Sequence, residues 1–239
     1  MAGWERVAGA ALGAGLAAGG VAYAALYPKS QIFGRTVVAP RRPGEMALTF
    51  DDGPNPDATP RLLELLARHG VRATFFVIGR FASREPELLR EVAAAGHVVG
   101  SHTMLHPWLA WQNNRRIRWE LAESQRVIED VLGARVVEFR PPHGARRPYV
   151  LQVARGLGMR TVQWNVIAND WENVTPEVIA ARVERGVTRA WRGGRAANVV
   201  LHDGGHLQAR ADRMRTVDAV ARILERHPAE RFVTVDAWP

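Results

Sequence analysis

The alternation of short apolar runs with amphipathic stretches is the feature that most constrains the fold of this chain. From Glu45 onward, each apolar run is followed by a stretch whose apolar residues have helical spacing. Such alternation is typical of βα units, in which a helix returns the chain to the start of the next parallel strand. We therefore expect an α/β fold with a parallel sheet.

The predicted elements favour a barrel over an open sheet. Strands are expected at residues 46–50, 74–78, 97–100, 136–139, 161–164, 198–201 and 232–235, and helices at 59–68, 86–95, 115–132, 148–157, 176–189 and 211–226. This set predicts a distorted (β/α) barrel of about seven parallel strands, with an irregular or missing repeat. An open doubly wound sheet is the alternative, but the chain has neither a dinucleotide fingerprint nor a P-loop.

The amino terminus differs in composition from the rest of the chain. Residues 7–27 carry no charge and are rich in Gly and Ala, and the run is long enough to cross a bilayer as a helix. Arg6 ahead of it and the small residues Ala22 and Ala24 also fit a secretory signal. We expect a signal peptide or transmembrane anchor at 1–27, a linker at 28–44 and a catalytic domain at 45–239. The protein would then be exported, and either membrane-anchored or located in the cell envelope or outside the cell.

Charge and cysteine content exclude several classes of function. The formal charge is +8, but the basic residues are spread along the chain and form no stripe interleaved with aromatic residues. We therefore expect no nucleic-acid partner, and no obligate protein partner is indicated. The chain has no cysteine, so any metal site must use histidine and carboxylate ligands.

Two pairs of candidate metal ligands follow the first and third expected strands. Asp51 and Asp52 leave the first strand at a Gly-Pro turn, and because adjacent side chains point in different directions, one carboxylate can bind a cation while the other acts as a base. His102 and His106 have the four-residue spacing of paired metal ligands. Asp before Gly-Pro is also common in ordinary turns, but the four residues together indicate a site with positions open for water and substrate.

Polar residues follow further strands, at the end where a barrel places its active site. They include Arg140, Asp170 and His202. Each is a weak signal alone, since His202 could be a core residue and Asp170 a helix cap. Together they predict a water-activating metal site with a carboxylate base, a histidine acid and an apolar pocket.

These residues resemble the motifs of the NodB-homology polysaccharide deacetylases, family four of the carbohydrate esterases. The resemblance runs from Ala47 to Val235 and contains five motifs in the family's order: Thr49-Phe50-Asp51-Asp52-Gly53, His102 with His106, Arg140-Pro141-Pro142-His143-Gly144, Asp170-Trp171, and Val200-Leu201-His202. The resemblance implies a metal bound by Asp52, His102 and His106. Zinc is the expected divalent ion, and cobalt, nickel, manganese or iron would accept the same ligands.

The resemblance also implies roles for the other motif residues. Asp51 would be the base, oriented by Arg140, and His202 would be the acid, held by Asp170. The backbone N–H of His143 would help to bind the oxyanion, whereas Trp171 and Val200 would line the acetyl pocket.

Three positions depart from the family pattern. His143 stands where many members have Tyr, Ile167 where some have Asp, and Val200 where Leu is usual. The first should alter groove contacts more than chemistry, because the implied oxyanion donor is a backbone group. The other two affect the shape of the acetyl pocket and the choice of substrate.

The implied activity is metal-dependent removal of N-acetyl groups from N-acetylglucosamine-type residues of a cell-wall or extracellular polysaccharide, with release of acetate. The glycan polymer is the expected partner, and the membrane is a second one through the amino-terminal segment. A hydrolase of another non-peptide C–N bond, in a small amide or cyclic imide, is the alternative. A noncatalytic glycan-binding or anchored structural protein is the third hypothesis.

Overall fold

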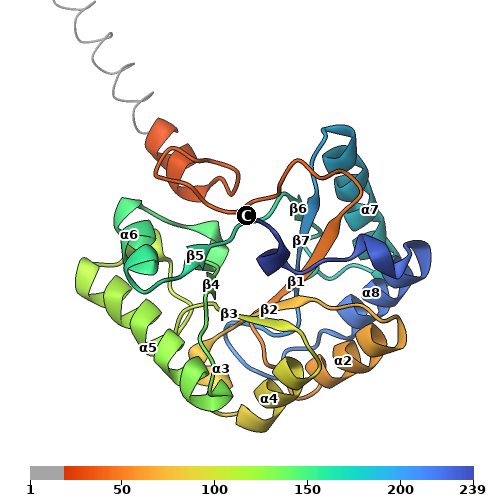
Figure 1. Ribbon diagram of the computed structural model, residues 1–239, viewed down its shortest axis with the longest axis horizontal. Coiled ribbons are helices and arrows are strands. Elements are labelled where there is room, and N and C mark those ends of the chain that lie inside the picture. Colours follow the sequence, from red (N-terminus) through yellow and green to blue (C-terminus); the bar gives the residue numbers. More distant parts are fainter. Residues whose placement is uncertain (1–18) are drawn as a thin grey trace, which may run out of the picture.

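The fold is built on one parallel sheet of seven strands. The computed structural model describes residues 19–239, and its sheet has the order β5-β4-β3-β2-β1-β7-β6. The strands are β1 (Met46–Asp51), β2 (Thr74–Val77), β3 (Val98–Ser101), β4 (Glu138–Phe139), β5 (Arg160–Thr161), β6 (Val166–Ile167) and β7 (Ala197–His202). The sheet curls, and helices surround it on the outside (Figure 1). The predicted distorted (β/α) barrel of about seven parallel strands is therefore confirmed.

The expected helices form, with boundaries shifted by up to three residues. The helices are α2 (Thr59–Arg68), α3 (Gly79–Ala82), α4 (Pro86–Ala94), α5 (Asn114–Leu132), α6 (Pro148–Gly156), α7 (Pro176–Arg192) and α8 (Met214–Arg226), with 3₁₀ turns η1 (Leu109–Trp111), η2 (Pro142–Gly144), η3 (Ala229–Arg231) and η4 (Val235–Ala237). Proline occupies the first turn of α2, α4, α6 and α7, where its fixed φ suits the helix and its missing N–H is not needed. The short helix α3 was not predicted.

The alternation of side chains along β1 separates the two faces of the sheet. Met46, Leu48 and Phe50 pack into the core beneath the helices. The intervening residues point to the opposite face. There Ala47 joins a second cluster with Phe76, Val162 and Trp238, and Asp51 ends the strand. Packing of Met46, Leu48 and Phe50 thus fixes which side chains of β1 face the barrel interior, and Asp51 is one of them.

The prediction of a strand at residues 232–235 is wrong. Phe232 makes a single parallel bridge to Met46, and Val235 begins the 3₁₀ turn η4. That edge of β1 is occupied by β2 from Thr49 onward, so no further ladder can form there. The seventh strand is instead β6, which was not predicted, and the strand expected at 161–164 is shortened and shifted to Arg160–Thr161.

Residues 28–44, expected to be a linker, pack along the open side of the sheet. Val37 forms a parallel bridge to Val162, with its N–H donating to the Thr161 carbonyl at 2.8 Å. On the other side, the Asn198 amide donates to the Val38 carbonyl at 3.0 Å. The segment thus lies between β5 and the β6–β7 pair, which do not pair with each other.

A buried arginine fixes the start of this segment to the domain. The Arg146 guanidinium is buried and donates to the carbonyls of Ser30, at 2.6 Å, and of Tyr27 and Gly144, both at 3.0 Å. The signal or anchor predicted at 1–27 lies outside the described residues up to position 18. Among residues 19–239, no helix combines the length and apolar character needed to span a membrane.

Candidate active site

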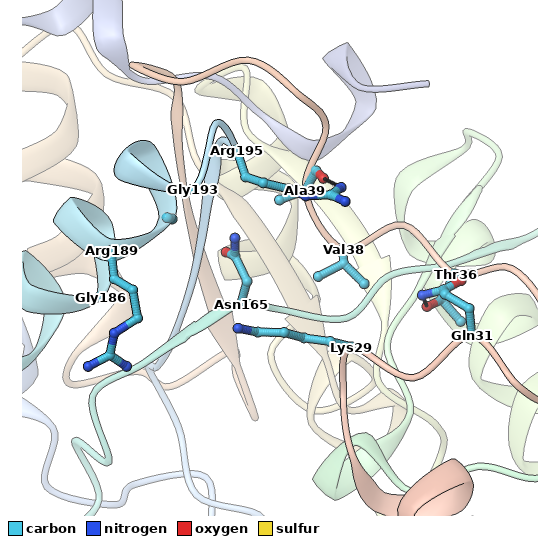
Figure 2. Close-up of a pocket in the computed structure, with 11 residues that line it drawn as sticks. Lys29, Gln31, Thr36, Val38, Ala39, Asn165, Gly186, Arg189, Gly193 and Arg195 are labelled. Atoms are coloured by element: carbon cyan, nitrogen blue, oxygen red, sulfur yellow. Dashed lines mark hydrogen bonds between the residues drawn. The ribbon is translucent and has the colours of Figure 1, made fainter.

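Two cavities of similar volume are candidates for the functional site. The first, of about 400 Å³, lies between residues 29–39 and the end of α7. Its charged residues are Lys29, Arg189 and Arg195, and their charged ends point in different directions (Figure 2). No carboxylate or imidazole from the described part of the chain lines it, so it offers no acid, base or metal ligand.

The second cavity lies at the carboxyl ends of the strands and has a volume of about 440 Å³. Eight of the residues predicted for the site line it: Asp51, Asp52, His102, His106, His143, Trp171, Val200 and His202. The other two, Arg140 and Asp170, are buried and bonded to residues that line it. The structure therefore brings all ten predicted site residues together, as expected where parallel strands end.

Asp52, His102 and His106 form a cluster that can hold a metal ion. Their ligand atoms lie within 4.8 Å of one another, and all three residues are buried. The Asp52 carboxylate oxygen Oδ1 lies 3.2 Å from His106 Nε2 and 3.6 Å from His102 Nε2, yet it has no hydrogen-bond partner among the described residues. A buried carboxylate oxygen without a hydrogen-bond partner among the described residues, facing two imidazole nitrogens, fits a cation ligand.

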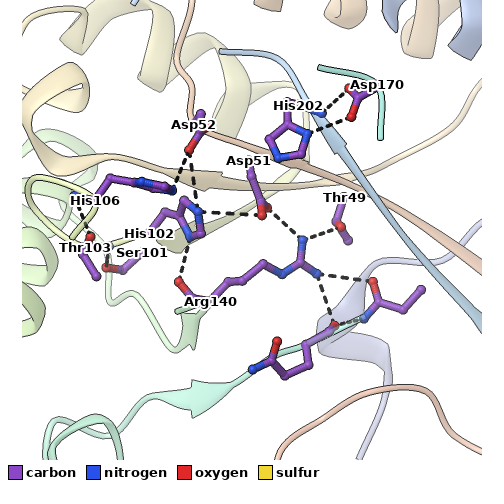
Figure 3. A network of polar contacts seen from close by, with 12 residues as sticks. Thr49, Asp51, Asp52, Ser101, His102, Thr103, His106, Arg140, Asp170 and His202 are labelled. Atoms are coloured by element: carbon purple, nitrogen blue, oxygen red, sulfur yellow. Dashed lines mark hydrogen bonds and ion pairs between the residues drawn. The ribbon is translucent and has the colours of Figure 1, made fainter. Parts of the chain in front are cut away.

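The surroundings prepare these histidines for binding a metal. His102 Nδ1 lies 2.7 Å from the Arg140 carbonyl (Figure 3), which leaves Nε2 directed at the cluster. Burial, followed by the charges of neighbouring histidines, holds the pKa of His106 well below its usual range, so this imidazole is neutral, as a metal ligand must be. Asp52 and His106 both adopt positive φ angles, 73° and 61°, a conformation that non-glycine residues adopt at a cost.

Asp51 is held by a fully buried arginine. Arg140 donates to Asp51 Oδ1 at 2.8 Å and to the Thr49 hydroxyl at 2.6 Å, and its guanidinium lies 4.1 Å from the Phe76 ring centroid. Burial lowers the pKa of Arg140, and the Asp51 charge opposes that shift. The second oxygen of Asp51, Oδ2, lies 3.7 Å from His102 Nε2. One oxygen is thus fixed while the other faces the metal cluster.

His202 is paired with a buried carboxylate. Asp170 Oδ1 lies 2.8 Å from His202 Nδ1, and Asp170 Oδ2 accepts from the His202 backbone N–H at 2.8 Å and from the Thr216 hydroxyl at 2.9 Å. Burial has the largest single effect and lowers the pKa of His202. The charge and hydrogen bond of Asp170, together with the charges of Asp52 and Asp51, outweigh it and raise the pKa to about 9. The imidazolium therefore persists at neutral pH. The Trp171 ring meets the His202 ring edge-on at 5.1 Å.

The turn after β1 requires glycine because two loops meet there. A Cβ atom on Gly53 would collide with the Asp203 carboxylate, and a Cβ on Gly204 would collide with the Asp52 carbonyl. Asp203 is buried and accepts a hydrogen bond from the Thr59 hydroxyl at 2.5 Å, and its burial raises the pKa to about 7. The close approach of these two loops places the end of β1 against the end of β7.

Four residues that line the cavity were not among the predicted site residues. They are Trp164, Ile167, His206 and Arg213; Ile167 was considered only as a departure from the family pattern. The His206 ring stacks on the His106 ring with centroids 4.7 Å apart. His206 follows Gly204-Gly205 in a loop rather than the strand end itself, so a search limited to strand ends misses it.

Comparisons with known proteins agree with the geometry. The family model described as polysaccharide deacetylase matches residues 39–162. A chitooligosaccharide deacetylase of Azorhizobium caulinodans is 34% identical over 175 residues, which cover 72% of this chain and 80% of that protein. The crystal structure of a peptidoglycan N-acetylglucosamine deacetylase is similar with a TM-score of 0.71 and 31% identity, covering 84% of this chain and 91% of that one.

One structural neighbour has a similar fold but is described as a pseudoenzyme. A carbohydrate esterase family 4 pseudoenzyme from Bacillus anthracis is similar with a TM-score of 0.72 and 25% identity, covering 85% of this chain and 68% of that one. The fold therefore does not by itself establish catalysis, which depends on the residues of the cavity.

Proposed function

This chain belongs to the polysaccharide deacetylase family, and from that membership we propose that it hydrolyses N-acetyl groups on N-acetylglucosamine residues of a cell-wall or extracellular polysaccharide. One observation carries the proposal. Asp51 and His202 are register partners on the neighbouring strands β1 and β7, and both line the cavity that contains the Asp52, His102 and His106 cluster. A base and an acid thus stand side by side at a metal site, as amide hydrolysis requires.

The proposed metal ligands are Asp52, His102 and His106, and zinc is the ion we propose. Two imidazoles and one carboxylate suit zinc, and cobalt, nickel, manganese and iron accept the same donors. When bound, the ion would polarise the acetyl carbonyl and lower the pKa of water in the cavity.

Asp51 is the proposed base. Its carboxylate takes a proton from the attacking water, while Arg140 orients it through the 2.8 Å contact. The water oxygen bonds to the acetyl carbon, and the backbone N–H of His143 is the proposed donor to the resulting oxyanion.

His202 is the proposed acid. It donates a proton to the amide nitrogen as the C–N bond breaks, because an amide anion is too poor a leaving group at neutral pH. Asp170 occupies Nδ1, which leaves Nε2 to carry that proton. The products are acetate and a free amine on the sugar.

Trp171 and Val200 are the proposed walls of the acetyl pocket. Both line the cavity, together with Ile167, and they present apolar surface to a methyl group. Val200 lies on β7 and is a register partner of Ile167 on β6, so these two positions form one side of the pocket together.

The proposed substrate implies export. We propose that residues 1–27 act as a signal peptide or membrane anchor. Fractionation of cells that express the full chain, with amino-terminal sequencing of the product, separates these two possibilities from retention in the cytoplasm.

Acetate release tests the proposed activity. The full chain is incubated with N-acetylglucosamine oligomers and with peptidoglycan, with and without chelator, beside an Asp51→Asn variant. We expect release that the chelator and the substitution both abolish. Circular dichroism should show that the variant is still folded at the assay temperature, with a lowered Tm because Arg140 loses its buried counter-charge. Metal-loaded protein that releases no acetate from any N-acetylated glycan would contradict the proposal.

A further inference from the structure

The ring of His206 covers one face of the proposed metal ligand His106. The two ring centroids lie 4.7 Å apart, with an angle of 21° between the planes. The rings of His102 and His143 meet the same ring at 60° and 77°, so of these three neighbours His206 is the closest to parallel. His106 is buried, whereas His206 is exposed. The His206 ring therefore lies between one face of the ligand and solvent.

The two proposed histidine ligands differ in how their rings are held. His102 Nδ1 lies 2.7 Å from the Arg140 carbonyl. His106 Nδ1 is buried and has no hydrogen-bond partner among residues 19–239. Histidine ligands are usually oriented by a hydrogen bond to the ring nitrogen that faces away from the metal. The orientation of the His106 ring depends instead on packing, and stacking is the contact that a neighbouring ring offers to its face.

The loop that carries His206 is held at both ends. The Asn55 side-chain amide donates to the carbonyls of Asp203 and Ala211, both at 2.9 Å. Within the loop, the chain packs so closely that a Cβ atom on Gly205 would collide with the Ala211 side chain. These contacts leave the backbone at His206 little freedom, so the position from which its ring extends is fixed.

Arg80 joins this loop to the loop that carries His106. The Arg80 backbone N–H donates to the Met104 carbonyl at 3.1 Å, and its guanidinium donates to the His206 carbonyl. Met104 lies two residues before His106 in the chain. The helix α3, to which Arg80 belongs, thus fixes the two loops relative to each other. The stacked rings are therefore positioned before a cation arrives, which lowers the entropic cost of binding it.

We propose that His206 is a positioning residue for the metal site. Its ring stacks on His106 and holds that imidazole in the orientation that binds a cation. The inference rests on the proposed function, because that function assigns His106 as a metal ligand. It gives His206 neither a bond to the metal nor a proton to transfer. The loop after β7 thereby contributes to metal retention as well as to the acid.

Metal binding by the full chain tests this role. Zinc affinity is measured by competition with a chromophoric chelator, and cobalt release by the loss of visible cobalt absorption after excess chelator is added. His206→Ala should weaken zinc binding by about two- to tenfold, the range for loss of one aromatic pair, and should speed cobalt release. His206→Phe should restore most of the affinity, because it keeps a flat ring but has no nitrogen to bind metal.

The absorption spectrum of the cobalt-loaded protein separates stacking from coordination. If His206 only stacks on His106, the bands of His206→Ala and His206→Phe should match those of the parent, because the ligands of the metal are unchanged. If His206 binds the metal itself, both variants should lose affinity equally and their bands should shift. That second result would overturn the positioning role.

Leu207→Ala is the matched control. Leu207 follows His206 in the same loop, is 83% exposed and does not line the cavity. This variant should bind zinc and release cobalt like the parent protein. Equal zinc affinity in the His206→Ala and parent proteins, or an equal loss of affinity in Leu207→Ala, would show that stacking by His206 does not position the ligand.

The positioning role and the proposed function fail in different ways. If the parent binds zinc and releases acetate but His206→Ala leaves metal affinity unchanged, only the positioning role is wrong. If zinc affinity responds as expected but the metal-loaded protein releases no acetate, the positioning role stands and the proposed activity is wrong. A parent protein that binds neither zinc nor cobalt would contradict the metal site and, with it, both proposals.

Discussion

Deleting residues 1–41 should destabilise the domain, although its boundary was predicted at residue 45. The deletion removes the carbonyls of Tyr27 and Ser30, which accept hydrogen bonds from the buried Arg146 guanidinium at 3.0 and 2.6 Å. It also removes the bridge between Val37 and Val162. Burial lowers the pKa of Arg146 to about 10, so the side chain remains charged at neutral pH. Deprotonation therefore does not offset the loss of its two hydrogen-bond acceptors.

The expected loss of folding free energy follows from the two hydrogen bonds that Arg146 donates to the carbonyls of Tyr27 and Ser30. Hydrogen bonds to a charged group contribute about 1.5–3 kcal/mol each, so two bonds amount to roughly 3–6 kcal/mol. Water that reaches Arg146 after the deletion replaces part of the lost hydrogen-bond energy. We therefore expect the free energy of unfolding to fall by about 3 kcal/mol. For a domain of this size, that loss corresponds to a fall in Tm of roughly 6–12 °C.

The fall in Tm is measured by circular dichroism or calorimetry on two fragments, one beginning at residue 19 and the other at residue 42. An Arg146→Met substitution in both fragments is the control. It removes the buried charge, so the difference in Tm between the fragments should shrink. Fragments whose Tm values agree within about 2 °C, less than 1 kcal/mol for a domain of this size, would refute the reasoning.

Three further predictions concern the site. Asp170→Asn should shift the alkaline limb of the pH–rate profile to lower pH, because Asp170 is the largest of the contributions that raise the pKa of His202 to about 9 and the proposed acid works only while protonated. His106→Ala should reduce bound metal measured by elemental analysis, by about 10- to 100-fold in affinity or more, since it removes a ligand outright; unchanged metal content would exclude His106 from the site. Gly53→Ala should lower the free energy of unfolding by about 1–3 kcal/mol in denaturant titration, because its Cβ would collide with the buried Asp203 carboxylate; unfolding like the parent protein would show that this loop can move aside.

The sequence predicts most of the barrel because periodicity reflects burial. The first strand alternates between the helix-covered core and the barrel interior, and its pattern of apolar residues is visible without a structure. The short strands at the edge are harder to predict: β5 and β6 have two residues each, too few for a period. Residues 232–235 are apolar enough for a strand, but β2 already occupies the edge of β1, and sequence does not show that competition.

The candidate site is predictable to the extent that its residues end strands. Asp51 and His202 end β1 and β7, and the barrel brings such ends together. Reasoning from strand ends does not predict His206, because this residue lines the cavity from a loop. Residues 28–44 are predicted to be a linker, but the contacts that they make depend on the gap between β5 and β6, which only the assembled sheet reveals.

The interior position of β1 in the sheet, between β2 and β7, has a consequence for the order of folding. Its hydrogen-bonded neighbour β7 lies about 150 residues further along the chain, as in the bond from Thr49 to the Val199 carbonyl. Loop closure over such a distance is slow, because its entropic cost comes before the contacts that offset it. Until residues 197–202 have been synthesised, one edge of β1 stays unpaired and open to other chains. The nascent chain is therefore most prone to aggregation late in its synthesis, when nearly all of the barrel already exists.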